Sequence, residues 1–206
     1  MQRPLRLLTL ATLAVAVALA APACDSHLDA KVGGALLPQA LDVVPAGDGP
    51  TVVVLPGTPA PTFAAGPVKL AIDHAVPWSE LGPLLAAADK AGAQPTLLVG
   101  QRNRIRGFRL SDELKDEYTL RFRPTSAGRF CLSPPGTREA YCVETGTRRH
   151  VSAIYVREAV QKAVAEYGIM QAWVVPDADT RWGDIVRTID GARTCCKEPF
   201  RVAVSR

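Results

Sequence analysis

The chain has 206 residues, 48% of them hydrophobic, which is enough to bury one or two small cores. Its formal net charge is +4, and two of the 24 basic residues lie in an N-terminal leader that we expect to be removed. The remaining charge of about +2 is too small a bias to indicate nucleic-acid binding.

Residues 1–23 have the organisation of an export signal. Two arginines precede the apolar run "LLTLATLAVAVALA", and the small residues "APA" follow it directly before Cys24. Lipidation of Cys24 would anchor the exported chain, whereas ordinary cleavage after "APA" would release it. The 17 uncharged residues of 7–23 approach the length of a membrane span, so an uncleaved anchor is a third alternative. We expect a protein of the bacterial periplasm that is anchored to the membrane through Cys24.

Residues 24–67 are rich in proline, glycine and alanine. This composition predicts a tether that sets the folded part away from the membrane. Only "TVVVL" at 51–55 has the β-branched density of a strand.

Residues 68–110 form a first organised half. The strand "VKLAID" is followed by apolar positions with the 3.6-residue period of a helix, a stop signal at Gly92 and the apolar run "TLLVG". The basic segment "RNRIRGFR" comes next. It is either a solvated sheet edge or a surface that meets an anionic polymer, a lipid head group or another partner. Its candidate residues are Arg102, Arg104, Arg106 and Arg109.

Residues 111–206 form a second, more complete half. A charged connection leads to the β-prone runs "RFCLS" and "AYCVE", then to a helix over about 152–167 that ends at Gly168. The strand "AWVV", the helix "RWGDIVRTIDGAR" and the run "FRVAV" complete it. This order predicts an α+β fold, a two-layer α/β sandwich in which helices cover small mixed sheets.

The chain contains five cysteines, and export would place them in an oxidising compartment. Lipidation of Cys24 leaves an even set of four. In one pairing, Cys131 bonds to Cys142 across the predicted hairpin, which leaves Cys195 and Cys196 as a strained vicinal pair. In the other pairing, both hairpin cysteines bond to Cys195 and Cys196. The sequence leaves the two pairings open.

The two halves share one reading frame. Asp73 matches Asp177 and Trp78 matches Trp182, each pair being 104 residues apart, and the match continues without a gap into the following apolar runs. A single offset over two elements indicates a duplicated module. We interpret both tryptophans as core residues at the start of apolar helix faces, with partner anchoring as the alternative.

The segments "LAIDHAVPWSELGPLLAAADKAG" and "VVPDADTRWGDIVRTIDGAR" resemble the periplasmic domain of the ExbD/TolR biopolymer-transport family. In that family a strand ends in an Asp, a polar turn leads to an aromatic residue, and a helix runs into the final strand. Asp73, Trp78, Asp177 and Trp182 stand at the matching places. The resemblance implies an ExbD/TolR-like module in two copies, the first incomplete, arranged as an internal pseudo-dimer or within a homodimer.

The resemblance also implies a non-catalytic, accessory or partner-binding role in an energy-transducing transport system, with no cofactor. The implied partners are ExbB/TolQ-like or TonB/TolA-like envelope proteins, or peptidoglycan. The family's membrane helix carries an Asp that handles protons, and residues 7–23 contain none.

An exported hydrolase with an unrecognised site is the alternative function. The "DADT" segment resembles the start of an aspartate-nucleophile phosphatase loop, but Arg181 stands where that loop needs Thr or Val. A calcium-binding loop is excluded at the same position, because it needs an oxygen ligand where Arg181 stands. We therefore expect Asp177 and Asp179 to cap the following helix. His27, His74 and His150 lack zinc-like spacing, so we expect surface residues and predict no catalytic or metal-binding residue.

Replacing Cys24 with Ser tests the anchor. If Cys24 carries a lipid, the Cys24→Ser protein is released from membranes after cell breakage, because no acyl chain then holds it. Membrane and supernatant fractions are compared by immunoblot. Unchanged membrane partitioning would count against lipidation and favour the uncleaved helix.

Overall fold

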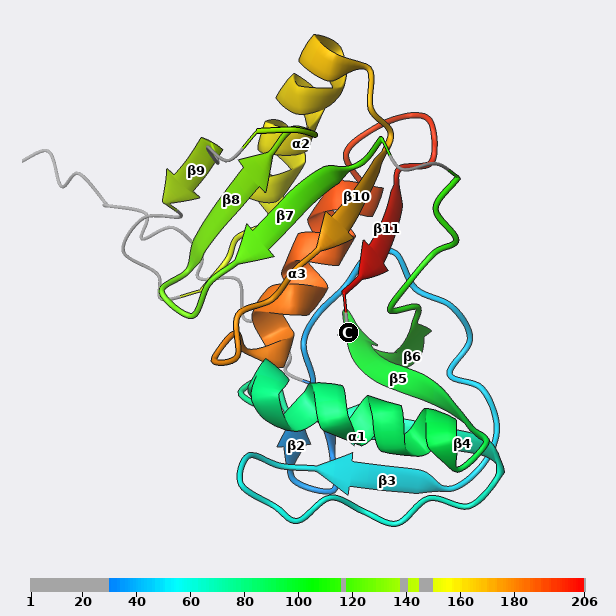
Figure 1. Ribbon diagram of the computed structural model, residues 1–206. Helices are drawn as coiled ribbons and strands as arrows, with labels where there is room; N and C mark the ends of the chain where they lie inside the picture. Colours follow the sequence, from blue (N-terminus) through cyan, green and yellow to red (C-terminus); the bar gives the residue numbers. More distant parts are fainter. Residues whose placement is uncertain (1–29, 116–117, 138–140, 145–149, 206) are drawn as a thin grey trace, which may run out of the picture.

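Two open sheets, one with a single helix and the other with two helices packed on one face, make up most of the computed structural model (Figure 1). The structure describes residues 30–115, 118–137, 141–144 and 150–205. The mixed sheets and their covering helices are the α+β fold expected from the order of the elements. The leader, Cys24 and His27 lie outside the described residues. Within the described residues, no helix is long and apolar enough to cross a membrane.

The first sheet has the strand order β3-β4-β5-β6. The first three strands run parallel and the last runs antiparallel to β5. Helix α1 connects β4 to β5 and buries Leu81, Leu84, Leu85 and Ala88, the apolar stripe that the 3.6-residue period predicted. The bounds are β3 (Thr51–Val54), β4 (Gly66–Ile72), α1 (Trp78–Lys90), β5 (Ala93–Gln101) and β6 (Arg104–Phe108).

The second sheet has the strand order β11-β10-β7-β8-β9. Strand β10 runs parallel to both β7 and β11, and β8 and β9 add antiparallel strands. Helix α2 ends at Gly168, whose φ of 69° is the left-handed conformation that glycine adopts without strain. The bounds are β7 (Leu120–Pro124), β8 (Arg129–Ser133), β9 (Tyr141–Glu144), α2 (Ala153–Tyr167), β10 (Gln171–Val174), α3 (Trp182–Arg193) and β11 (Arg201–Val204).

Residues 30–67 pack against the first half, which corrects the tether prediction for this range. The short strands β1 (Lys31–Val32) and β2 (Ala35–Leu36) pair with each other, and β3 joins the first sheet. A small apolar cluster covers the sheet face opposite α1, because short apolar segments between the prolines are buried there. Its buried members are Ala35, Leu37, Ala71 and Leu98. The first half therefore extends back to β3 and is more complete than predicted.

The two halves meet where α1 and α3 begin. Pro77 and Arg181, which are 104 residues apart, form an antiparallel bridge. Four backbone hydrogen bonds surround it, and each has its counterpart 104 residues away. Donated by the first-named residue, they join Trp78 to Thr180 (2.8 Å), Ser79 to Ala178 (2.8 Å), Trp182 to Val76 (2.8 Å) and Gly183 to His74 (2.9 Å). The bonds around this bridge are thus related by a local twofold axis.

These bonds cap the two helices. The first N–H groups of a helix have no partner inside it and usually bind a Ser, Thr, Asp or Asn side chain at the N-cap. Pro77 and Arg181 occupy the N-cap positions here, and neither makes a side-chain cap. Carbonyl groups of the opposite half accept the bonds instead. The prediction that Asp177 and Asp179 cap α3 is wrong, because their carboxylates bind Arg123 and Ser126.

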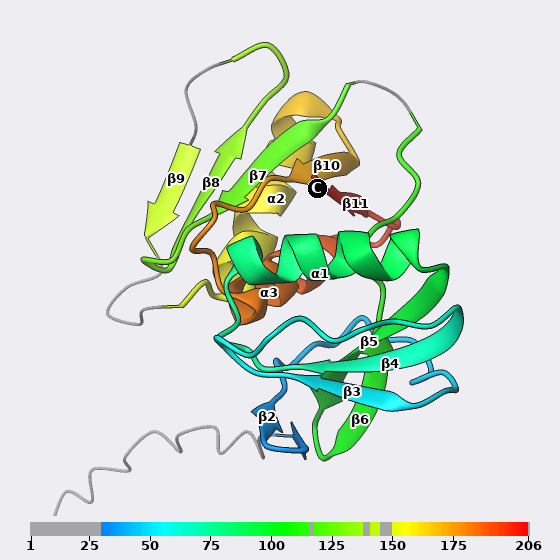
Figure 2. The same cartoon turned by 60° about the horizontal axis from the view of Figure 1, so that its bottom comes forward.

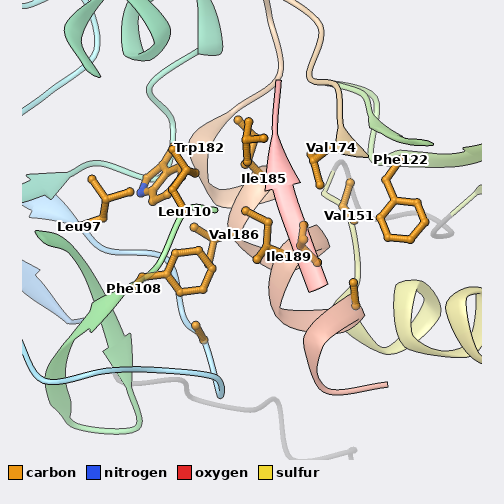
Figure 3. Packing of buried hydrophobic residues seen from close by; sticks show 14 of the residues in the cluster. Leu97, Phe108, Leu110, Phe122, Val151, Val174, Trp182, Ile185, Val186 and Ile189 are labelled. Atoms are coloured by element: carbon orange, nitrogen blue, oxygen red, sulfur yellow. The ribbon is translucent and has the colours of Figure 1, made fainter. Parts of the chain in front are cut away.

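One continuous apolar core spans both halves. Trp182 is fully buried, and its ring lies 6.1 Å from that of Phe108 in an edge-to-face contact. Figure 3 shows the Trp182 ring beside Leu97, Leu110 and Phe108 of the first half. Trp78 is only partly buried against the same core. The core interpretation therefore applies in full to Trp182 and in part to Trp78.

Leu81 and Ile185 are equivalent positions in the two halves, and both are fully buried. Replacing either with Ala should lower the free energy of unfolding by about 2–5 kcal/mol, through lost burial and a residual cavity. Because the core and the caps are shared, we expect one unfolding transition in each variant. Tryptophan fluorescence and far-UV circular dichroism should give the same urea midpoint. Two separate transitions would show that the halves fold independently.

Candidate functional site

No helix of the described residues covers one face of the five-stranded sheet. Side chains alternate between the two faces of a strand, and the apolar set of β7, β8 and β10 points to α2 and α3. Arg121 and Arg123 of β7 and Trp173 of β10 point the other way. Trp173 lies in register with Arg121, so the two side chains project from adjacent positions on the same face. The Trp173 side chain is 39% exposed. We call this surface, with Arg121, Arg123 and Trp173, the open face.

A disulfide bond links two strands of the second sheet beside Arg123. Cys131 of β8 is in register with Arg123 on one side and with Cys142 of β9 on the other. The structure links Cys131 to Cys142, with Cα atoms 4.0 Å apart, and links Cys195 to Cys196. This is the first of the two pairings that the sequence left open. Cross-strand covalent linkage restricts the freedom of this edge.

The two sheets differ in what covers this face. In the first sheet the face opposite α1 is closed by the cluster around Leu37 and Leu98. In the second sheet the face opposite α2 and α3 has no comparable cover among the described residues, and it carries exposed aromatic and basic side chains. Large exposed aromatic and arginine side chains are typical of protein binding surfaces.

The two motif aspartates have structural roles. Asp73 accepts backbone hydrogen bonds from Leu36 at 2.8 Å and from Ala75 at 2.9 Å, so it holds the N-terminal segment against the turn before α1. Asp177 accepts from Arg123 Nε at 2.8 Å and fixes that guanidinium at the end of the open face. The equivalent positions therefore bind different partners in the two halves.

Helix α3 carries a buried carboxylate near its C-terminus. Asp190 is 3% exposed, and its Oδ1 accepts the backbone N–H groups of Leu41 and Asp42, both at 2.7 Å. Burial raises the pKa of Asp190 above its usual value, and the two N–H donors partly oppose that rise. The N-terminal segment thus crosses α3 and is held by this side chain.

Arg193 joins the two halves through an ion pair and a hydrogen bond. Its side chain is 5% exposed; Nε lies 3.0 Å from Asp112 Oδ2, and Nη1 lies 3.5 Å from Asp42 Oδ2. Nη1 also donates to the carbonyl oxygen of Arg109 at 2.6 Å, and the guanidinium lies 5.6 Å from the Phe108 ring centroid. Beside it lies a cavity of about 480 Å³ with balanced charge. Because the lining holds equal numbers of basic and acidic side chains, the cavity favours neither an anionic nor a cationic ligand.

The candidate arginines of the basic segment are divided between two places. Arg104 and Arg106 share one face of β6, and Arg102 occupies the turn between β5 and β6. Arg109 lies beyond β6, and its Nη1 is 3.8 Å from Asp112 Oδ1. The structure therefore separates Arg109 from the other three.

Two histidines that the sequence placed on separate surfaces lie close together. The ring centroids of His74 and His150 are 6.4 Å apart, and His150 Nδ1 is 3.8 Å from Asp184 Oδ1. Asp184 is fully buried, and its Oδ1 accepts the Val151 N–H at 2.9 Å and a bond from Arg187 at 3.2 Å. Both histidines are half-buried, so the surface prediction holds only in part for them.

Burial changes the proton affinities of this pair. Burial raises the pKa of Asp184, although the Val151 N–H and the Arg187 guanidinium act in the opposite direction. Burial also lowers the pKa of His150, although the negative charge of Asp184 acts to raise it. An imidazole beside a buried carboxylate is a group that can transfer a proton near neutral pH. Within the described residues, no group of three His, Cys, Asp or Glu side chains has the geometry to hold a metal ion.

Sequence reasoning missed the Asp184 and His150 pair. The available signal was an Asp directly before the apolar pair Ile185 and Val186, a position where a buried charge is costly unless it has partners. Comparisons with known proteins add no identification: no protein-family model, no curated protein and no solved structure matches the chain.

Asp190 offers a test of how the N-terminal segment is held. Asp190→Ala removes the acceptor of two N–H groups and should lower the free energy of unfolding by about 2–4 kcal/mol. Asp190→Asn keeps an acceptor oxygen and removes a charge that burial disfavours. It should therefore lower the free energy of unfolding by less than about half of the loss in Asp190→Ala. Urea unfolding of the two variants measures both values. Equal losses would contradict the assigned role of the Oδ1 acceptor.

Proposed function

We propose that this protein is a non-catalytic cell-envelope component, related to the periplasmic domain of ExbD/TolR, that binds a partner of an energy-transducing transport system. The proposed location is the bacterial periplasm, with a membrane anchor at the leader or at Cys24. The proposed partners are ExbB/TolQ-like or TonB/TolA-like proteins, with peptidoglycan as the other candidate.

The relationship is supported by the two strand–helix–strand units in one frame. Units β4-α1-β5 and β10-α3-β11 each join two parallel, adjacent strands. If two modules of a dimer-forming family are fused into one chain, they are expected to pack about a local twofold axis. The antiparallel bridge between Pro77 and Arg181 has this symmetry. The internal pseudo-dimer is therefore the form of pairing that we propose.

The observation that carries the binding role is the open face. Trp173 is a large exposed side chain on a central strand, and Arg121 lies beside it in register. Trp and Arg supply a large share of the binding energy in protein interfaces. Because both side chains project from a paired sheet, little backbone order has to be gained on binding. We assign the partner-binding role to this face.

The chain is not proposed as the proton-handling subunit. Proton transfer within a bilayer needs a titratable group at membrane depth, and the run at 7–23 offers only apolar side chains and two threonine hydroxyls. The proposed role is therefore accessory and is exercised from the envelope side.

Trp173→Ala tests the proposed function, with Tyr155→Ala as the matched control. Tyr155 is an aromatic residue on α2, is 45% exposed and lies away from the open face. Binding is measured by calorimetry with purified periplasmic parts of the ExbB/TolQ-like and TonB/TolA-like proteins of the same cell, and by co-sedimentation with isolated peptidoglycan.

We expect one of these ligands to bind the unchanged protein. Trp173→Ala should weaken that binding by about tenfold or more, because truncating a central interface tryptophan typically costs about 2 kcal/mol or more. Tyr155→Ala should leave it unchanged. The proposal is wrong if none of the ligands binds, or if the two variants bind equally.

The contact between Asp184 and His150 favours one second candidate, an exported hydrolase. A histidine positioned by a carboxylate is the usual arrangement of a general base. Purified protein would be assayed with peptide, ester and glycoside substrates. Hydrolysis that disappears in His150→Gln but persists in Trp173→Ala would replace the binding proposal.

A further inference from the structure

The β5–β6 hairpin presents an exposed basic and apolar tip. Arg102 and Arg104 are exposed. Ile105 follows Arg104 on β6, projects from the other face of the hairpin end, and is 40% exposed. Leu41 lies next to them, since its carbonyl oxygen accepts a bond from Gln101 Nε2 at 3.1 Å, and its side chain is 61% exposed. We call Leu41, Arg102, Arg104 and Ile105 the basic hairpin tip.

The charges of the tip are available to an external anion. Within the described residues, neither Arg102 nor Arg104 forms an ion pair. Asp42, which directly follows Leu41 in the sequence, is directed to Arg193 at 3.5 Å and to neither of the tip arginines. Arg102 also has a φ of 56°, a left-handed conformation that a non-glycine residue rarely adopts. The tight turn therefore holds a long cationic side chain at the end of the hairpin.

The described chain begins close to this tip. The carbonyl oxygen of Ala30 accepts a bond from the Leu37 N–H at 2.8 Å. The next residue, Pro38, accepts from the Gly100 N–H at 2.9 Å, and Gly100 directly precedes the strand end that leads to Arg102. Figure 2 shows β2 and the turn end of β6 together at the lower end of the molecule.

The length of chain before Ala30 limits how far the tip can lie from an anchor. Five residues separate Cys24 from Ala30 in the sequence, and a fully extended chain of that length spans at most roughly 20 Å. An anchor at Cys24 or in the leader would therefore keep this end of the fold near the membrane surface. Basic side chains within about a Debye length of anionic lipids are attracted to them.

We propose that the basic hairpin tip docks on the anionic lipid head groups of the membrane to which the chain is anchored. Arg102 and Arg104 bind lipid phosphates, while Leu41 and Ile105 enter the boundary between head groups and acyl chains. Docking orients the folded part against the membrane. The inference rests on the proposed envelope location, but it does not depend on which partner binds the open face.

Vesicle co-sedimentation tests this surface without a protein partner. The chain from Asp25 onward is used, because all described elements and both apolar clusters lie within residues 30–205 and keep every contact when the leader is removed. The vesicles contain phosphatidylcholine alone or mixed with phosphatidylglycerol. Binding is measured at low and at high salt.

Two double variants carry the same change in net charge. Arg102→Gln with Arg104→Gln alters the tip, whereas Lys162→Gln with Lys197→Gln alters exposed positions of the second half that lie outside the open face. Circular dichroism and the urea midpoint establish that each variant is folded. Leu41→Ser with Ile105→Ser tests the apolar contribution separately.

The unchanged chain should bind the anionic vesicles, bind the neutral vesicles far less, and be released by high salt. The tip double variant should lose about twenty-five-fold in partition coefficient, because each of the two basic side chains near an anionic surface contributes roughly a fivefold factor. The control variant should lose less than about threefold. Absence of binding to anionic vesicles, or equal losses in the two charge variants, would overturn the proposal. Neither result depends on the Trp173 experiment, so the two proposals fail separately.

Discussion

The rest of the structure depends on how α1 and α3 begin. Neither helix has a capping side chain, since the N-cap positions are Pro77 and Arg181. The orphan N–H groups at each N-terminus bind carbonyl groups in the turn before the other helix. Each half therefore supplies the hydrogen-bond acceptors for the helix N-terminus of the other half. Separating the halves would leave backbone N–H groups unpaired on both sides. The two halves thereby share their helix caps, and the bonds between them have a local twofold symmetry.

This arrangement makes α3 the centre of the molecule. It is covered by the second sheet, by α2 and by the N-terminal segment, so even its polar residues Asp184 and Asp190 are buried. Each carboxylate accepts backbone N–H groups from a segment that lacks regular partners at that point. The positions that these two carboxylates hold are residues 41–42 of the N-terminal segment and Val151, which directly precedes the N-cap of α2.

The sequence predicted the elements that local periodicity encodes. The apolar stripes of α1 and α2, the glycine at the end of α2 and the shared frame of the two halves were all visible in the residues. The packing of 30–67 was not, because its prolines masked short apolar segments whose partners are distant in sequence. The caps of α1 and α3 were missed for a related reason: carbonyl groups of the opposite half make them, and no side-chain pattern encodes a backbone acceptor. Asp179 has the chemistry of a cap, but its carboxylate binds Ser126.

Native-state hydrogen exchange of individual backbone amides tests reciprocal capping most directly. Amides in the first turn of an ordinary helix exchange through local fraying, with little protection. The account predicts that the amides of Trp78, Ser79, Trp182 and Gly183 exchange only through global unfolding, with the same denaturant dependence as amides of the central strands β4 and β10. Fast exchange of these four amides while the central strands remain protected would contradict it, because the halves would then not depend on each other for their caps.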